Sequence, residues 1–298
     1  MLARASLLDR DGLELADVAC RHPRGRGDAG EVADRYGIVF IRRGYFVRSA
    51  DGVETILDPT LAYWVTPSTE QRFDHPDDHG DDCTALLLED GLIHSLWEAD
   101  RDLPSGPIPT TPEVDLEHRL LLAAARGGAD QHALFERSLS LVARMLEQHD
   151  PSPIGSGRPS TARARAALVE GARELLAADP QRSLTDLSGE LAASPHHLSR
   201  IFRQATGHTI SAHRIRLRVR AALERLAGGD HDLARLAAEL GFTDQSHLTR
   251  SVRAETRATP GALRSALAQR RQRDAQAEGA QSYERGVGQP APQVPASA

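Results

Sequence analysis

Two segments in the last third of this 298-residue chain resemble each other, and this repeat constrains the fold more than any other feature. They are residues 184–204, LTDLSGELAASPHHLSRIFRQ, and residues 233–254, LARLAAELGFTDQSHLTRSVRA. In both segments leucines recur at the three- and four-residue steps of an amphipathic helix. The second copy gains one residue near its middle, where a turn tolerates an insertion. The repeat therefore predicts two copies of one helical unit.

Each copy carries the capping residues of two short helices joined by a turn. Ser194 is a natural N-cap, and Pro195 suits the first helical position, where its missing N–H costs nothing. In the second copy Asp232 caps the first helix and Gly241 ends it. The sequence therefore predicts two helix-turn-helix motifs, with residues 211–229 as one long helix between them.

The second helix of each copy shows a polar face suited to nucleic acid. Arginine donates two hydrogen bonds to guanine, glutamine pairs with adenine, and serine or threonine does either. Such groups read bases from the first turns of a helix in the major groove. A helical bundle with a solvated arginine face is the alternative, but two copies in phase favour recognition helices. The expected DNA-binding residues are His196, Ser199, Arg200, Arg203, Gln245, Ser246, Thr249, Arg250 and Arg253.

Charge is divided unevenly along the chain. Residues 1–160 hold 16 Arg and 28 Asp or Glu, a net charge of -12, whereas residues 161–268 hold 16 Arg and 11 acids, a net charge of +5. This division indicates that only the second half binds a polyanion such as nucleic acid. Chance variation in surface charge is the alternative explanation. Four arginines of the predicted long helix, at positions 214, 216, 218 and 220, fit either phosphate contacts or pairing with acids.

Four segments of residues 165–268 resemble the AraC/XylS family of regulators. They are LTDLSGELAASPHHLSRIFR (184–203), RVRAALERL (218–226), GFTDQSHLTR (241–250) and ATPGALR (258–264). The resemblance implies a transcription regulator that binds double-stranded DNA, and RNA polymerase if it activates. It places base contacts on residues 196, 199, 200, 245, 246, 249 and 250. The chain departs from the family pattern at His213, Val252, Arg257 and Leu263, where Tyr, Phe, Gly and Tyr are usual.

The N-terminal half has a different pattern. Residues 37–90 contain short β-branched and aromatic runs separated by turn residues, with a hairpin signal at Asp51-Gly52. Residues 112–148 predict two helices split at Gly127-Gly128, and their apolar stripe suits either a dimer interface or packing on the protein's own sheet. By resemblance to the family, we expect an N-terminal cupin-like β-barrel that binds a small-molecule effector or mediates homodimerisation, within an α+β fold.

We expect four parts. They are a cupin-like sensor and dimerisation domain at 1–150, a linker at 151–164, an AraC-type double helix-turn-helix domain at 165–268 and a disordered tail at 269–298. No apolar run approaches the roughly 20 residues of a membrane span, and the N-terminus has no secretory pattern. A cytoplasmic protein is therefore expected. Tyr45, Phe46, Tyr63 and Trp64 fit either an effector site or core packing.

Cysteine and histidine side chains in the N-terminal half suggest metal binding. Cys20, His22, His75 and Cys83 have the ligand types of a zinc site, so zinc is the candidate cofactor. The alternatives are two buried cysteines beside an acidic loop, or a redox-sensitive cysteine pair.

No catalytic residues stand out, so we expect no enzyme. The His-x-His and Glu motif with which cupin barrels hold a catalytic metal is absent, and the sequence shows no nucleophile–base pair, phosphate loop or paired carboxylates. A DNA-bending protein without sequence preference is a further alternative, and its binding would vanish with salt.

Overall fold

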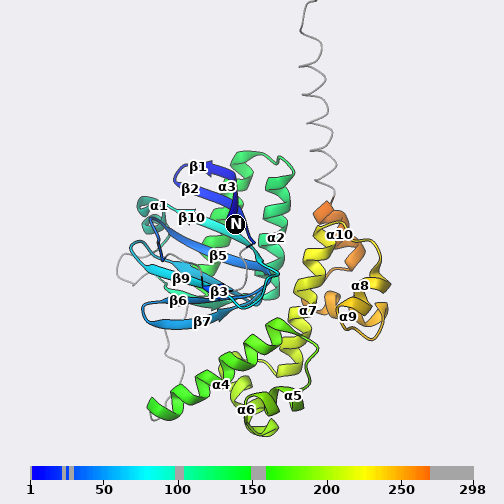
Figure 1. Ribbon diagram of the computed structural model, residues 1–298. Coiled ribbons are helices and arrows are strands. Elements are labelled where there is room, and N and C mark those ends of the chain that lie inside the picture. The colour runs from blue at the N-terminus through cyan, green and yellow to red at the C-terminus, as the bar shows by residue number, and fades with distance from the viewer. Residues whose placement is uncertain (1, 22–24, 27–29, 98–103, 149–158, 269–298) are drawn as a thin grey trace, which may run out of the picture.

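The computed structural model describes residues 2–21, 25–26, 30–97, 104–148 and 159–268. Two antiparallel sheets and a helical hairpin form the N-terminal half, and helices alone form the C-terminal half (Figure 1). The tail predicted at 269–298 lies outside the described residues, as does His22.

Within the described residues the strands form two open sheets, whereas a closed cupin-like barrel was expected. The larger sheet has the order β1 (Leu2–Arg10), β2 (Leu13–Cys20), β10 (Asp81–Leu88), β5 (Tyr36–Arg43), β8 (Leu61–Val65) and β11 (Gly106–Pro109). The smaller has the order β3 (Gly25–Arg26), β9 (Glu70–His75), β6 (Phe46–Ala50) and β7 (Val53–Leu57), with β4 (Glu31–Val32) beside β9. The predicted α+β class is confirmed.

The larger sheet is buried on both faces, which explains its nearly continuous apolar runs. Along β5, Ile38 and Phe40 point to one core cluster, whereas Val39 and Ile41 point to the other. Between the sheets, the Phe46 ring lies 6.3 Å from Tyr63 and 5.6 Å from Phe73, measured between ring centroids. Phe46 and Tyr63 therefore pack in the core, and Trp64 packs on the opposite face of the sheet.

The helical hairpin covers the outer face of the larger sheet. After the short α1 (Asp90–Leu96), α2 (Pro112–Arg126) and α3 (Gln131–Glu147) bury Val114, Leu121, Leu141 and Met145 against the strands. The other side of α2 packs on the C-terminal half through Leu116 and Leu120. Both sides of α2 are thus covered within one chain. This agrees with the prediction that the apolar stripe of residues 112–148 packs on the protein's own sheet, which was the alternative to a dimer interface.

Seven helices follow: α4 (Pro159–Ala178), α5 (Leu184–Glu190), α6 (Pro195–Thr206), α7 (Ile210–Ala227), α8 (Leu233–Glu239), α9 (Gln245–Thr256) and α10 (Pro260–Ala268). The helix α4 begins inside the segment expected to be a linker. Two separate core clusters support the two predicted motifs, one around Leu198 and Phe202 and one around Leu248 and Val252. No helix in the described ranges is long and apolar enough to cross a membrane.

Buried ion pairs join the two halves of the chain. Arg42 of β5 and Arg119 of α2 both contact Glu224 of α7, and the Arg119–Glu224 distance is 2.6 Å. Arg220 of α7 pairs with Asp115 of α2, and both side chains are almost inaccessible to solvent. Because desolvated charges are costly unless paired, these contacts fix how α7 lies against the sheet domain.

A second buried contact joins the β7–β8 turn to α4 and α7. The Asp58 carboxylate is fully buried and accepts a 2.8 Å hydrogen bond from Arg173 of α4. His213 of α7 lies 3.9 Å from the same carboxylate. The Arg173 guanidinium holds the pKa of Asp58 at about 2, against the raising effect of burial. Burial lowers the pKa of His213 to about 4, although Asp58 opposes that shift.

Two backbone positions in each motif adopt left-handed conformations that favour glycine. In the motif turn these are Ala192 (φ 49°) and Gly241 (φ 73°), and after the second helix they are Gly207 (φ 74°) and Arg257 (φ 61°). Each copy therefore holds one glycine and one strained residue, and the left-handed conformation costs a non-glycine residue roughly 1–2 kcal/mol.

The Ala192→Gly variant should be more stable than the wild type by roughly 0.5–1 kcal/mol, because relief of strain exceeds the added entropy of the unfolded chain. Gly207→Ala is the matched control and should lose about 1 kcal/mol, since a Cβ there meets no atom within 4 Å and only the backbone conformation opposes it. Urea unfolding measures both. Equal stability of all three proteins would contradict the strain.

Stability should fall as pH falls through the range set by His213. The unfolded histidine titrates near 6.5 and the folded one at about 4, so the unfolded chain binds more protons between these values. Between pH 7.5 and pH 5 this group should remove about 2 kcal/mol from the free energy of unfolding. The His213→Gln variant should not show this decrease of about 2 kcal/mol between pH 7.5 and pH 5. The His79→Gln variant, changed at an exposed loop position, should show it as the wild type does. If the free energy of unfolding changes with pH in the same way in the wild type and in His213→Gln, His213 is not a neutral buried histidine.

Candidate nucleic-acid interface

The helices α6 and α9 are started by equivalent caps. Ser194 accepts a 3.2 Å hydrogen bond from the His197 N–H, and Pro195 occupies the first turn as predicted. Asp244 accepts a 2.7 Å hydrogen bond from the His247 N–H. Because each cap fixes the first turn, the residues expected to read bases begin at a defined point in both helices.

The predicted reading faces of α6 and α9 match position by position. Leu198 and Leu248 are buried at the same point, and each holds its helix on its own core. Ser199 and Thr249 are half-buried next to them. The remaining predicted residues are all exposed: His196, Arg200, Arg203, Gln245, Ser246, Arg250 and Arg253.

The exposed arginines of these faces are free for an anionic partner. In the part of the chain that the structure describes, Arg200, Arg203, Arg250 and Arg253 make no ion pair with an acid. The Arg200 guanidinium lies 3.4 Å from the Nδ1 atom of His197, which is a weak contact. A surface depression of about 480 Å³ beside α6 is lined by His196, Ser199, Arg200, Arg203, Gln204 and Thr209.

The arginines of α7 have a different role, which the sequence left open. Arg214 and Arg218 donate to the Pro180 carbonyl, and Arg218 also donates to the Gly241 carbonyl at 2.9 Å. Arg216 and Arg220 donate to the Thr110 carbonyl of the N-terminal half. These arginines therefore bind protein carbonyls and acids. No local signal separates them from Arg200, because their partners lie 23 to 110 residues away.

The departures from the family pattern fall away from the reading faces. Val252 and Leu263 are buried in the core of the second motif, and His213 is buried beside Phe202. Arg257 ends α9 in the left-handed conformation. The spacer α7 has 18 residues, or about 27 Å, which holds the two motifs apart. The expected separation of one groove turn between α6 and α9 stays a prediction.

The residues expected to bind metal are only partly brought together. The Cys20 thiol and the His75 imidazole are in contact, and the Cys83 thiol lies on the far side of Asp81, which the predicted set did not include. Both cysteines are free thiols and buried. His22 lies outside the described residues.

Residues 187–266 match the family model described as a helix-turn-helix domain. The C-terminal half therefore carries an AraC-type helix-turn-helix domain, the DNA-binding domain of transcription regulators, and the resemblance to AraC/XylS regulators is confirmed. A search of curated proteins finds no match to the chain.

The solved structures that resemble this chain include those of ToxT from Vibrio cholerae. One ToxT variant without ligand is 12% identical, covers 87% of this chain and 99% of its own, and has a TM-score of 0.37. Wild-type ToxT with bound unsaturated fatty acid is 13% identical, covers 87% and 98%, and has a TM-score of 0.35. A cupin superfamily protein from Desulfitobacterium hafniense is 14% identical, covers 30% and 79%, and has a TM-score of 0.26. These scores are too low to transfer a ligand or an activity.

If Arg218 is structural, Arg218→Ala should lower the free energy of unfolding by about 2–3 kcal/mol, because two carbonyls lose a charged donor. Arg200→Ala is the control and should change stability by less than about 0.5 kcal/mol, since Arg200 is exposed and makes no ion pair with any described residue. Thermal and urea unfolding measure both. If Arg218→Ala is as stable as the wild type, Arg218 is not a structural residue and is again a candidate for contact with DNA phosphate.

Proposed function

We propose that this protein is a sequence-specific transcription regulator that reads DNA with α6 and α9. The observation that carries the proposal is the match between the two faces, each with exposed arginines that have no acidic partner in the described residues. Arg200 and Arg250 occupy the same position in each helix, six residues beyond the cap, on the face with which a recognition helix meets base edges. Arg203 and Arg253 lie one turn further and suit phosphate contacts.

The proposed division of the chain follows the expected one. Residues 1–150 form the regulatory half, 151–164 the linker, 165–268 the reader and 269–298 a tail. Support for a regulatory role comes from α7, which is held by Arg42, Arg119 and Asp115 of the N-terminal half and connects the two motifs. A small-molecule effector that moved these residues would change the reader.

Other partners follow from the resemblance alone. A homodimer, and RNA polymerase in the case of an activator, stay predictions. The effector also stays a prediction, and the packed rings of Phe46, Tyr63 and Phe73 argue against a preformed site between the sheets at that point. A hollow of about 420 Å³ between the larger sheet and the end of α7, lined by Arg4, Asp17, Arg42, Arg126 and Glu224 among others, has the size of a ligand site.

Selection of bound fragments from a random, GC-rich DNA pool tests the reader. The wild type should enrich a motif of two blocks about one helical turn apart. Arg200→Ala should relax one block and Arg250→Ala the other, each with a loss of about 1–3 kcal/mol of affinity for the selected site. Arg72→Ala, an exposed arginine of the N-terminal sheet, is the matched control and should leave the motif unchanged.

Two outcomes would contradict the proposal. A motif indifferent to both substitutions would remove base reading from α6 and α9. Binding that enriches no sequence and disappears with salt would favour the architectural alternative.

A further inference from the structure

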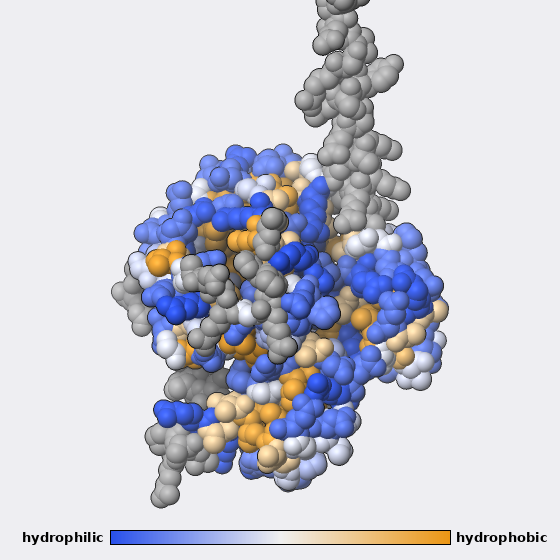
Figure 2. All heavy atoms as spheres, viewed as in Figure 1, coloured by the Kyte–Doolittle hydropathy of each residue, from blue (hydrophilic) through white to orange (hydrophobic). Residues whose placement is uncertain are grey.

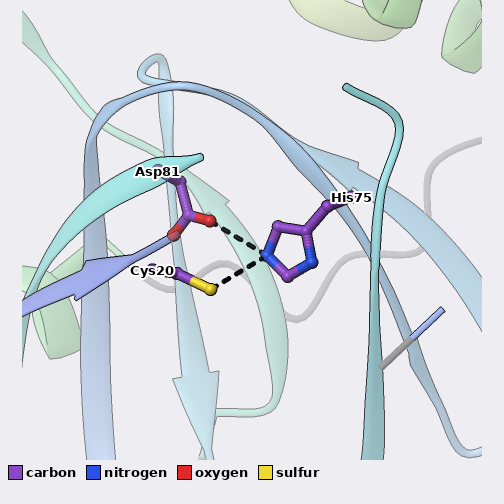
Figure 3. A group of neighbouring side chains, drawn as sticks. All are labelled: Cys20, His75 and Asp81. Carbon is purple, nitrogen blue, oxygen red and sulfur yellow. Dashed lines mark hydrogen bonds and ion pairs between the residues drawn. The ribbon is translucent and has the colours of Figure 1, made fainter. Parts of the chain in front are cut away.

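Three buried side chains from three strands converge at one end of the sheet domain (Figure 3). Cys20 ends β2 and lies opposite Asp81, which begins β10, in the pairing of these two strands. His75 ends β9 and comes from the smaller sheet. Cys20 is 7% exposed, Asp81 is 4% exposed and His75 is 6% exposed. The cluster therefore joins the two sheets in a site sheltered from bulk water.

The contacts meet at a single atom. The His75 Nε2 lies 3.4 Å from the Cys20 Sγ and 3.0 Å from the Asp81 Oδ2, and both lines reach the same ring nitrogen (Figure 3). A catalytic relay places its nucleophile on one imidazole nitrogen and its carboxylate on the other. A sulfur and an oxygen on one nitrogen do not form a relay. The sulfur, the nitrogen and a carboxylate oxygen all lie within 4.8 Å of one another, close enough to share one metal ion.

The donor types and separations fit zinc. Zinc lies about 2.3 Å from a thiolate sulfur and about 2.0–2.2 Å from an imidazole nitrogen or a carboxylate oxygen in tetrahedral sites. Tetrahedral angles then place sulfur and nitrogen about 3.5 Å apart, and nitrogen and oxygen about 3.3 Å apart. The measured separations are 3.4 and 3.0 Å, so side-chain shifts of a few tenths of an ångström admit the ion.

The charge of the cluster also favours a cation. The Asp81 side chain is buried, and within the described ranges no arginine pairs with its carboxylate. Its other oxygen, Oδ1, accepts from the Cys83 thiol at 3.4 Å. A buried carboxylate is stabilised by a cation beside it, and a divalent ion bound to these donor atoms would supply one. The Cys83 contact orients the carboxylate from behind, as residues around a metal ligand commonly do.

We propose that Cys20, His75 and Asp81 bind a zinc ion that clamps the two sheets together. The site differs from the expected set in that Asp81 replaces Cys83 as a ligand. It is also unlike the His-x-His and Glu metal motif of cupin barrels, which this chain lacks. The proposal concerns the N-terminal half and is independent of DNA reading by α6 and α9.

Metal binding by the full-length protein tests the site. After removal of metal with a chelator, the wild type should take up one equivalent of Zn²⁺ in competition with a chromophoric chelator. With Co²⁺ it should show the thiolate-to-metal absorption of a sulfur ligand. His75→Gln and Asp81→Asn should each weaken zinc binding by about 100-fold or more, because each removes a direct ligand. Cys20→Ser should abolish the thiolate absorption.

Controls separate a lost ligand from a lost fold. Asp81→Asn keeps the side-chain volume, and far-ultraviolet circular dichroism should match the wild type. His79→Gln removes a histidine of the same loop whose side chain is 83% exposed, and it should bind zinc as the wild type does. The proposal is overturned if the wild type takes up no stoichiometric zinc, or if all three ligand variants bind it as tightly as the wild type.

Discussion

Charged side chains without access to water hold the two halves of this protein together. Arg42 and Arg220 are each 2% exposed, and each lies across the boundary between the sheet domain and α7. A buried guanidinium is stable only with its partner, and removing one partner of such a pair costs about 3–5 kcal/mol. The position of α7 therefore depends on Asp115 and Glu224 meeting these two arginines.

The same constraint decides which arginines remain for DNA. In the N-terminal half Asp17 binds Arg42 and Arg126, and Asp115 binds Arg119, so the acidic half neutralises several of its own cations. On α7 the guanidinium groups hold carbonyls. Arg200 and Arg250 are not held by buried acids or carbonyls of the described part of the chain, because the buried sides of their helices consist of leucine and other apolar side chains. Within the described residues, α6 and α9 thus keep arginines without an acidic partner, although the chain as a whole carries a net charge of -6. In Figure 2 the surface over the second motif is mostly hydrophilic, whereas apolar residues gather over α4.

The sequence predicts what depends on local spacing and misses what depends on distant partners. The repeat and its caps at Ser194 and Asp232 locate both motifs, and Asp51-Gly52 locates the β6–β7 hairpin. The strands β1 and β2 lack a clear alternation of apolar and polar residues and were not predicted. The open sheet arrangement likewise follows from pairing between strands far apart in the chain. Cys20 and His75 could be grouped by ligand type, but Asp81 joins them only because β2 and β10 pair in one particular register.

That register also brings the cluster close to the interdomain contact. Asp81 and Cys83 are two residues apart on β10, and the Cys83 carbonyl accepts a 3.1 Å hydrogen bond from Arg42. Arg42 in turn reaches Glu224 of α7. The Arg42 guanidinium on this path is 2% exposed and also bonded to Asp17. These contacts form a contiguous path from the cluster to α7, the helix that connects the two motifs. A cation on Cys20, His75 and Asp81 would fix the start of β10, which is the strand whose Cys83 carbonyl holds Arg42 at the boundary with α7.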